Sequence, residues 1–226
     1  MKVLLLNGSI HEKGNTYAAL LEIGEELKKQ GIDYDIFQIG VKPIQDCIGC
    51  RKCKESGFCI FNDDSVNEFI NKAKEADGFI FGSPVYYAHP SGRILSFLDR
   101  VFYCKSKMFN FKPVASVAIA RRAGTSTTFD VLNKYATISN MILIGSSYWN
   151  NAFGGTNQET KADLEGMQTM RNLARNMAYV LKLIELGKQN NLLPPEIEKS
   201  NYTNFTRKDL LENKWFSFVS YLYFIG

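Results

Sequence analysis

The chain has 226 residues, of which 45% are hydrophobic and 22% are charged, and its formal net charge is +4. This length and composition suit one sizeable α/β domain with an appendage, and no Lys/Arg block is long enough for a nucleic-acid or membrane patch. No apolar run reaches the length of a membrane span, and the run at Val3–Leu6 is too short for a signal peptide, so we expect a cytoplasmic protein.

Strand-like and helix-like segments alternate through the first half of the chain. Lys2 to Asn7 is a short apolar run that predicts a buried strand, and the apolar spacing from Thr16 to Lys29 predicts a helix. A less buried strand is expected at Tyr34 to Ile39. A cysteine-rich loop follows, and the capping residues at positions 63–65 predict a helix that runs to about Ala76.

The alternation continues to about residue 186. Buried strands are predicted at Gly78–Gly82, Val114–Ala120 and Met141–Gly145. Helices are predicted from Pro90, which suits a first helical turn, through Val101, from Gly124 to Ser139, and from Lys161 to Leu186.

Alternating strands and helices with apolar strands predict a parallel sheet covered on both faces. Five such units suit a flavodoxin-like, doubly wound sheet with the strand order 2-1-3-4-5. We assign this domain to residues 1–187 and a C-terminal extension to residues 188–226. The extension holds six aromatic residues between Trp215 and Phe224, which we expect to cover a neighbouring subunit in a homodimer or homotetramer. Folding back onto its own domain is the alternative.

The loop from Gly8 to Thr16 lies between the first strand and its helix. Such a position is an anion site, because free backbone N–H groups and the helix dipole face the ligand. Ser9, Asn15 and Thr16 offer side-chain donors, and His11 adds positive charge. The loop matches neither a Walker A motif nor a Gly-x-Gly-x-x-Gly dinucleotide motif. A glycine-rich turn with an ordinary helix cap remains the alternative.

Four of the five cysteines fall within thirteen positions, in a loop at residues 46–62. In a reducing compartment such a group indicates metal, cluster or redox chemistry rather than disulfides. The compact spacing suits a [4Fe–4S] cluster better than zinc, whose structural sites join two ligand pairs across a longer stretch. Redox thiols or simple packing groups remain open as alternatives, and Cys104 is expected to be an ordinary buried thiol. The four residues are Cys47, Cys50, Cys53 and Cys59.

Three motifs in the same order resemble the NADPH-dependent FMN reductase and iron–sulfur flavoprotein group. They are the Gly-Ser-x-x-x-x-Gly-Asn-Thr loop, the Cys-Ile-Gly-Cys-x-x-Cys segment and the Gly-Ser-Pro-Val-Tyr-Tyr turn, and the resemblance covers about the first 185 residues. It implies an FMN phosphate site at Ser9, His11, Asn15 and Thr16, and it assigns all four clustered cysteines as ligands.

The same resemblance implies that Pro84 to Tyr87, namely Pro84, Val85, Tyr86 and Tyr87, bind the flavin ring. This turn should lie across the switch point of the sheet from the phosphate loop. The loop that holds Arg121 and Gly124 should reach the same cleft, where a cation near the flavin would favour its reduced form. Arg121 and its neighbour Arg122 are equally compatible with a solvated pair.

The leading functional hypothesis is an FMN-dependent oxidoreductase that takes hydride from NAD(P)H and reduces a small acceptor. Quinones, flavins, nitro-aromatics and azo-aromatics are candidate acceptors. The flavin N5 would carry the chemistry, so no catalytic side chain is assigned. The alternatives are an electron carrier with FMN and a [4Fe–4S] cluster, which would exchange electrons with a redox protein, and a non-enzymatic flavin-binding module.

Overall fold

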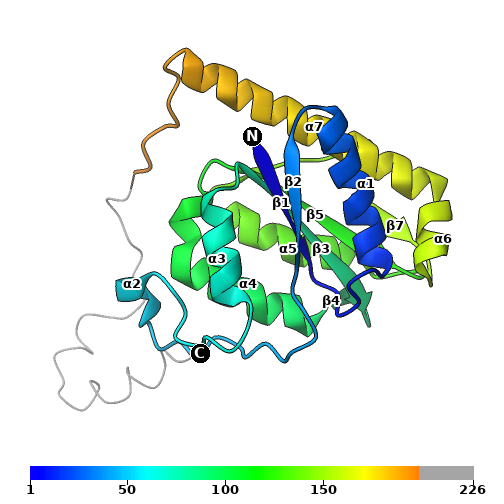
Figure 1. The fold of residues 1–226 in the computed structure, drawn as a ribbon, viewed down its shortest axis with the longest axis horizontal. Coiled ribbons are helices and arrows are strands. Elements are labelled where there is room, and N and C mark those ends of the chain that lie inside the picture. The colour runs from blue at the N-terminus through cyan, green and yellow to red at the C-terminus, as the bar shows by residue number, and fades with distance from the viewer. Residues whose placement is uncertain (199–226) are drawn as a thin grey trace, which may run out of the picture. The chain divides into compact units, whose positions relative to one another are not determined.

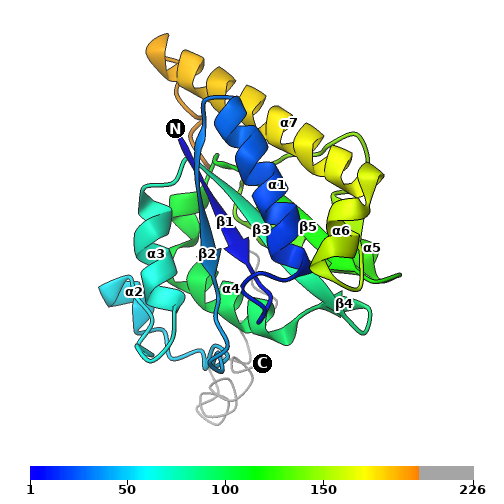
Figure 2. The same ribbon diagram turned by 45° about the vertical axis from the view of Figure 1, so that its right-hand side comes forward.

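The sheet is built around β1 (Lys2–Asn7), whose residues from Val3 to Leu6 are buried. In this computed structural model, which describes residues 1–198, β1 pairs in parallel with β2 (Asp33–Gln38) and with β3 (Gly78–Tyr86). β3 in turn pairs in parallel with β5 (Pro113–Ala120). The order β2-β1-β3-β5-β6 confirms the predicted flavodoxin-like arrangement (Figures 1 and 2).

Two short strands share the fifth position, where the sequence predicts one strand over Met141–Gly145. β6 (Ile142–Leu143) pairs with the beginning of β5, and β7 (Asn151–Phe153) pairs with its end. The intervening loop leaves the sheet after Ile144, whose amide donates to the Val114 carbonyl at 2.9 Å. The prediction was therefore right about the position and wrong about a single continuous strand.

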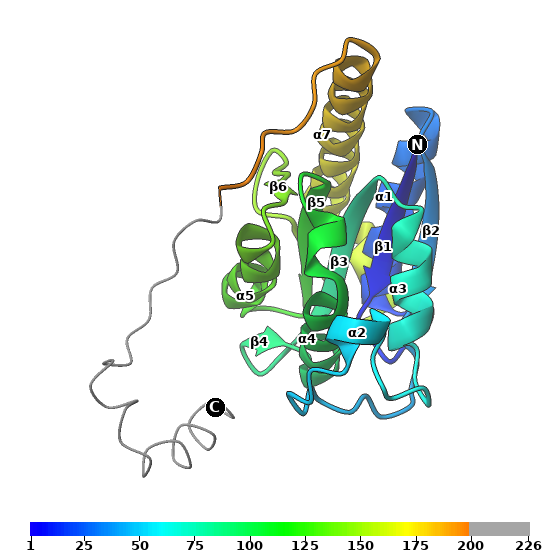
Figure 3. The ribbon, with the colours of Figure 1, turned by 90° about the vertical axis from the view of Figure 1, so that its left-hand side faces the viewer.

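Helices cover both faces of the sheet (Figures 1 and 3). The predicted helix over Lys161–Leu186 divides at Asp163, because the Asp163 carboxylate accepts the Gly166 amide at 2.9 Å and so caps a new helix. One face carries α1 (Asn15–Lys29), α6 (Asn157–Ala162) and α7 (Leu164–Gln189), and the other carries α3 (Val66–Lys74), α4 (Gly92–Lys105) and α5 (Thr125–Ile138). The short α2 (Cys53–Ser56) and a 3₁₀ turn (Ser106–Phe109) complete the helices of the described residues.

Two hydrophobic cores lie between the sheet and these helices. The core under α3 and α4 is aromatic, and the Phe69 ring lies edge-on to Phe37 and Phe97 at centroid distances of 5.2 and 5.3 Å. The core under α1 and α7 is mainly aliphatic and includes Met170 and Leu173. Apolar side chains on both faces of the strands explain why the strand segments are continuous apolar runs.

The sequence predicts Pro90 in the first turn of a helix, but α4 begins after it, at Gly92. Pro90 lies in β4 (His89–Pro90), a short antiparallel partner of the end of β3, and Ser91 caps α4 by accepting the Ile94 amide at 3.4 Å. The loop between the predicted strand over Gly78–Gly82 and the helix is thus a hairpin that extends β3 to Tyr86.

Residues Met1–Leu192 form one compact unit. No helix among residues 1–198 combines the length and apolar character needed to cross a membrane. The aromatic run from Trp215 to Phe224 lies outside the described residues, so its proposed contact with a second subunit stays a prediction.

The two cores predict a large difference between two isoleucines that both lie in helices. Ile70 in α3 is 0% exposed, whereas Ile138 in α5 is 86% exposed. We expect Ile70→Ala to lower the free energy of unfolding by about 2–5 kcal/mol because it opens a cavity in the aromatic core. The matched control Ile138→Ala should change it by less than about 0.5 kcal/mol. Urea denaturation followed by circular dichroism measures both, and equal effects would contradict the described packing.

Candidate functional site

The carboxyl ends of β1, β3 and β5 meet at one edge of the sheet (Figure 2). The Gly8 amide donates to the Gly82 carbonyl at 2.8 Å, and the Ser91 hydroxyl donates to the Gly8 carbonyl at 3.2 Å. These two bonds fix the loop after β1 against the loop after β3 and the beginning of α4. The structure thus brings together the two segments that the sequence predicts to flank a ligand.

The loop from Gly8 to Thr16 is held by its own hydrogen bonds. The Ser9 amide donates to Asn7 Oδ1 at 3.1 Å, and the His11 amide donates to Ser9 Oγ at 3.1 Å. The Asn15 side chain donates to the Gly154 carbonyl at 2.7 Å, which ties the beginning of α1 to the loop after β7. Ser9 and Asn15 therefore shape the loop, while the exposed His11 side chain faces solvent.

Thr16 carries an unsatisfied polar atom at the first turn of α1. Its residue is 1% exposed, and its Oγ1 has no hydrogen-bond partner within residues 1–198. The first amides of a helix also lack partners inside the helix, and the N-cap Gly14 supplies no side-chain acceptor. A buried hydroxyl and free amides at a helix N-terminus are the donors that a phosphate group accepts. This loop therefore fits the phosphate of FMN.

The turn between β3 and β4 presents two tyrosines at the same edge. The Ala88 amide donates to the Tyr86 carbonyl at 3.0 Å across Tyr87, whose φ is 56°. A positive φ is strained for an aromatic residue, and such strain is often retained at ligand sites. Tyr86 is 44% exposed and Tyr87 is 101% exposed, so both rings are accessible to a bound molecule.

The loop after β5 packs directly on this turn. Gly124 has a φ of 86°, and a Cβ atom there would lie 2.7 Å from Val85 Cγ1 and 2.9 Å from Ala88 Cα. Only glycine fits such a close approach. The predicted meeting of the Gly124 loop with the Pro84 to Tyr87 segment is therefore present. Arg121 and Arg122 are both exposed on this loop.

Sequence reasoning missed a polar link between the ends of β1 and β2. Asn7 is fully buried, and its Nδ2 donates to Gln38 Oε1. Gln38 Nε2 in turn donates to the Ser9 carbonyl at 2.7 Å, and the Ile39 amide donates to the Asn7 carbonyl at 3.2 Å. The sequence signal for this link was the polar residue at the end of each strand, Asn7 in β1 and Gln38 in β2. This link connects the Gly8–Thr16 loop with the base of the cysteine loop.

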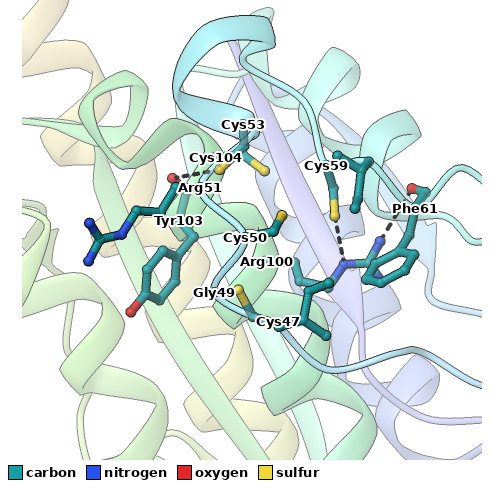
Figure 4. Close-up of a pocket in the computed structure, with 12 residues that line it drawn as sticks. Cys47, Gly49, Cys50, Arg51, Cys53, Cys59, Phe61, Arg100, Tyr103 and Cys104 are labelled. Carbon is teal, nitrogen blue, oxygen red and sulfur yellow. Dashed lines mark hydrogen bonds between the residues drawn. The ribbon is translucent and has the colours of Figure 1, made fainter. Parts of the chain in front are cut away.

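The cysteine loop surrounds a pocket between α2 and α4 (Figure 4). All five cysteines are free thiols, and Gly49, Arg51 and Gly57 have positive φ values that allow the tight turns. Asn67 holds the last cysteine of the motif: its Oδ1 accepts the Cys59 amide and its Nδ2 donates to the Cys59 carbonyl, each at 2.8 Å. The pocket is lined by Cys47, Cys50, Cys53 and Cys59, as the spacing predicts, and also by Cys104.

Cys104 differs from its prediction as an ordinary buried thiol. It is only partly buried, and it lines the same pocket as the other four cysteines. Burial, together with the neighbouring Cys53, raises the pKa of the Cys104 thiol to about 12. Cys104 lies on α4, far from the other four cysteines in sequence, so the sequence did not indicate that it would line the same pocket.

The side chains that could bind a metal in this pocket are thiols, the ligand type of iron–sulfur clusters. Within residues 1–198, no three His, Cys, Asp or Glu side chains converge as the ligands of one ion must. A [4Fe–4S] cluster takes one thiolate on each of its four irons, so its ligands surround a larger volume. Five thiols line the pocket, and the four that come from one loop match that requirement in number and chemistry.

Sequence reasoning also missed Arg100. It is 1% exposed on α4 and forms a buried ion pair with Asp64. Its Nε also donates to Cys59 Sγ at 3.1 Å (Figure 4). Burial alone would lower the pKa of Arg100, but its hydrogen bonds to Asp64 and Cys59 outweigh burial, so the pKa lies above its ordinary value. The guanidinium therefore stays charged beside the cysteine pocket.

A family model described as NADPH-dependent FMN reductase matches residues 1–156, which include every strand and loop described above. The chain belongs to the NADPH-dependent FMN reductase family. Members of this flavodoxin-like family bind FMN, and the Thr16 loop and the Tyr86 turn agree with that property. The resemblance inferred from the three sequence motifs is thereby confirmed.

Several proteins with similar sequences are described as iron–sulfur flavoproteins. One from Methanocaldococcus jannaschii is 34% identical over 196 residues, which cover 82% of this chain and 100% of that protein. Another from Methanosarcina thermophila is 28% identical over 190 residues, which cover 82% and 97%. Among solved structures, a WrbA-like flavodoxin from Agrobacterium tumefaciens shares the fold, with a TM-score of 0.56, 16% identity and coverage of 80% and 96%.

The unpaired Thr16 hydroxyl yields a test of the phosphate loop. We expect Thr16→Val to weaken FMN binding roughly 10- to 100-fold, since a hydrogen bond to a charged group contributes about 1.5–3 kcal/mol. The FMN-free variant should be at least as stable as the wild type, because an unpaired buried hydroxyl is removed. Fluorescence titration of FMN and urea denaturation measure the two effects.

Ser116→Ala is the matched control for that experiment. Ser116 Oγ is also buried without a partner in residues 1–198, but it lies in the middle of β5 rather than at its carboxyl end. This variant should bind FMN as tightly as the wild type. Unchanged FMN affinity in Thr16→Val would remove Thr16 from the phosphate site.

Proposed function

We propose that this protein is a redox protein that holds FMN at the carboxyl edge of its sheet and a [4Fe–4S] cluster in its cysteine loop. Electrons would pass between the two groups and leave to a small acceptor or a redox protein. The observation that carries the proposal is that the four cysteines of one short loop line a single pocket. The relatives described as iron–sulfur flavoproteins support the same assignment.

The residues around the FMN site would bind and orient the cofactor. Bound FMN supplies both one-electron and two-electron chemistry at its ring. The amides at the beginning of α1 and the Thr16 hydroxyl would hold the phosphate, with Ser9, His11 and Asn15 shaping or completing the loop. The backbone of Pro84 to Tyr87 would face the ring. Arg121 would add positive charge from the loop that packs on this turn at Gly124.

The residues around the cysteine pocket would bind the cluster. A bound [4Fe–4S] cluster supplies one-electron transfer. Cys47, Cys50, Cys53 and Cys59 would be its ligands, and Asn67 fixes the backbone of the last one. Cys47, Cys53 and Cys59 are partly buried and Cys50 is exposed, so one ligand position would lie at the protein surface.

The two proposed sites are joined through the ends of neighbouring strands. The cysteine loop begins after β2, and Gln38 at the end of β2 donates to the Ser9 carbonyl of the phosphate loop at 2.7 Å. The Ser65 hydroxyl donates to the Ile39 carbonyl at 3.1 Å and fixes the base of the cysteine loop from its other side. These bonds hold both loops to the same framework.

A second candidate function is favoured by the family and by the open aromatic edge. In it, NAD(P)H would donate a hydride to the flavin N5, and the reduced flavin would pass it to a quinone, flavin, nitro-aromatic or azo-aromatic acceptor. Tyr86 and Tyr87 are exposed at this edge, where a flat acceptor would stack. Assembly into a homodimer or homotetramer, without nucleic acid or membrane as a partner, remains a prediction.

Purification without oxygen tests the proposed cluster. We expect about four irons and four sulfides per chain, together with flavin bands and a broad visible shoulder in the absorbance spectrum. Cys50→Ala should lose the iron and keep FMN, since the two sites use separate loops. Cys104→Ala should keep both, because this thiol lies outside the four-cysteine motif.

The outcome separates the two candidate functions. Iron-free wild-type protein that still oxidises NAD(P)H with an added quinone would replace the first function by the second. Iron-loaded protein whose FMN is reduced by dithionite much faster than that of iron-free Cys50→Ala would support the first. Iron loss in Cys104→Ala but not in Cys50→Ala would overturn the ligand assignment.

A further inference from the structure

We propose that Arg100 is a positioning residue that makes the cluster of the cysteine pocket easier to reduce. It would do so by donating a hydrogen bond to the Cys59 sulfur and by placing a fixed positive charge beside it. This inference rests on the proposed cluster site and adds to it a residue outside the cysteine motif. Arg100 comes from α4, 41 positions beyond Cys59 in the sequence.

The first support is the direct contact. Arg100 Nε donates to Cys59 Sγ at 3.1 Å, a short distance for a hydrogen bond to sulfur (Figure 4). The Cys59 backbone is fixed on both sides by Asn67. Donor and acceptor are thus both held in place, so the contact does not depend on a mobile side chain.

The second support is that every N–H group of the guanidinium has an acceptor. Nε serves Cys59, while Nη1 donates to Asp64 Oδ2 and to the Gln45 carbonyl at 3.1 Å. Nη2 donates to Asp64 Oδ1 at 3.2 Å and to the Phe61 carbonyl at 3.4 Å. The five donors of a guanidinium are therefore all used, and the planar group has one fixed orientation. A lysine could not reproduce this arrangement.

The third support is electrostatic. Arg100 and Asp64 are 1% and 2% exposed as side chains, so water screens their charges little. The Nε edge of the cation contacts the sulfur, and Asp64 lies on the opposite, Nη edge. The sulfur therefore faces the positive member of the pair. Adding an electron makes the cluster and its ligands more negative, so a hydrogen bond and a positive charge at a ligand sulfur favour the reduced state.

The experiment is an anaerobic potentiometric titration of the purified, cluster-loaded protein, with dithionite as reductant and electron paramagnetic resonance as readout. We expect Arg100→Gln to shift the cluster midpoint to a more negative potential by at least tenfold in the reduction equilibrium, or 59 mV for one electron. Asp64→Asn should shift it in the opposite direction, because it removes the negative charge that offsets Arg100. The control Arg51→Gln removes an exposed arginine of the same loop and should shift it much less.

The opposite signs separate an electrostatic role from a structural one. If Arg100 only held the loop in shape, Arg100→Gln and Asp64→Asn would loosen the same contacts and change the potential in the same direction. Either that result or an unchanged potential in iron-loaded Arg100→Gln would contradict the inference alone. Wild-type protein without iron would contradict the proposed cluster and, with it, this inference.

A second variant covers the case in which Arg100→Gln fails to fold or to load iron. Arg100→Lys keeps the charge and loses the planar fork, so it should load iron and show a smaller negative shift than the glutamine variant. If neither variant loads iron while Arg51→Gln does, Arg100 acts in the assembly of the site, and the inference about the potential is wrong.

Discussion

The parallel pairing of β1 on both of its edges is the constraint on which the rest of the molecule depends. Val3 to Leu6 pair with β2 on one side and with β3 on the other, and helices cover both faces of the strand. A strand surrounded in this way has no contact with water, so its apolar side chains supply much of the burial that stabilises the fold. Both β2 and β3 run parallel to β1, so the chain has to return along a face of the sheet before it begins each new strand.

Both proposed sites follow from that direction. In a parallel sheet all the strands end at one edge, so the loop after β1 and the loop after β2 begin next to each other. The first contains Thr16 and the second contains the four cysteines. Because β2 and β3 lie on opposite sides of β1, the chain from Ile39 to Asp77 has to pass over the sheet, and it has room for the cysteine loop and α3. Asn7 and Gln38 join the two loops where they leave the sheet.

Local patterns in the sequence were enough to predict the framework and the two main loops. The apolar run before Gly8, the helical spacing after Thr16 and the spacing of the cysteines each involve few residues, and the structure places them as expected. The split fifth strand and the role of Arg100 were not predictable in this way. Arg100 stands next to Asp99 among the apolar residues of α4, but its contacts with Asp64 and Cys59 join distant parts of the chain.

The difference in sequence separation between the two loops has a consequence for biosynthesis. The four cysteines lie within thirteen positions, so a short emerging segment already carries a complete set of thiols. Closing such a small loop costs little chain entropy. The FMN loop, by contrast, needs Gly154 to hold Asn15, a contact across 139 positions that exists only after the sheet has formed. Under the proposed function, iron could therefore be delivered before the fold is complete, whereas flavin would be bound only afterwards.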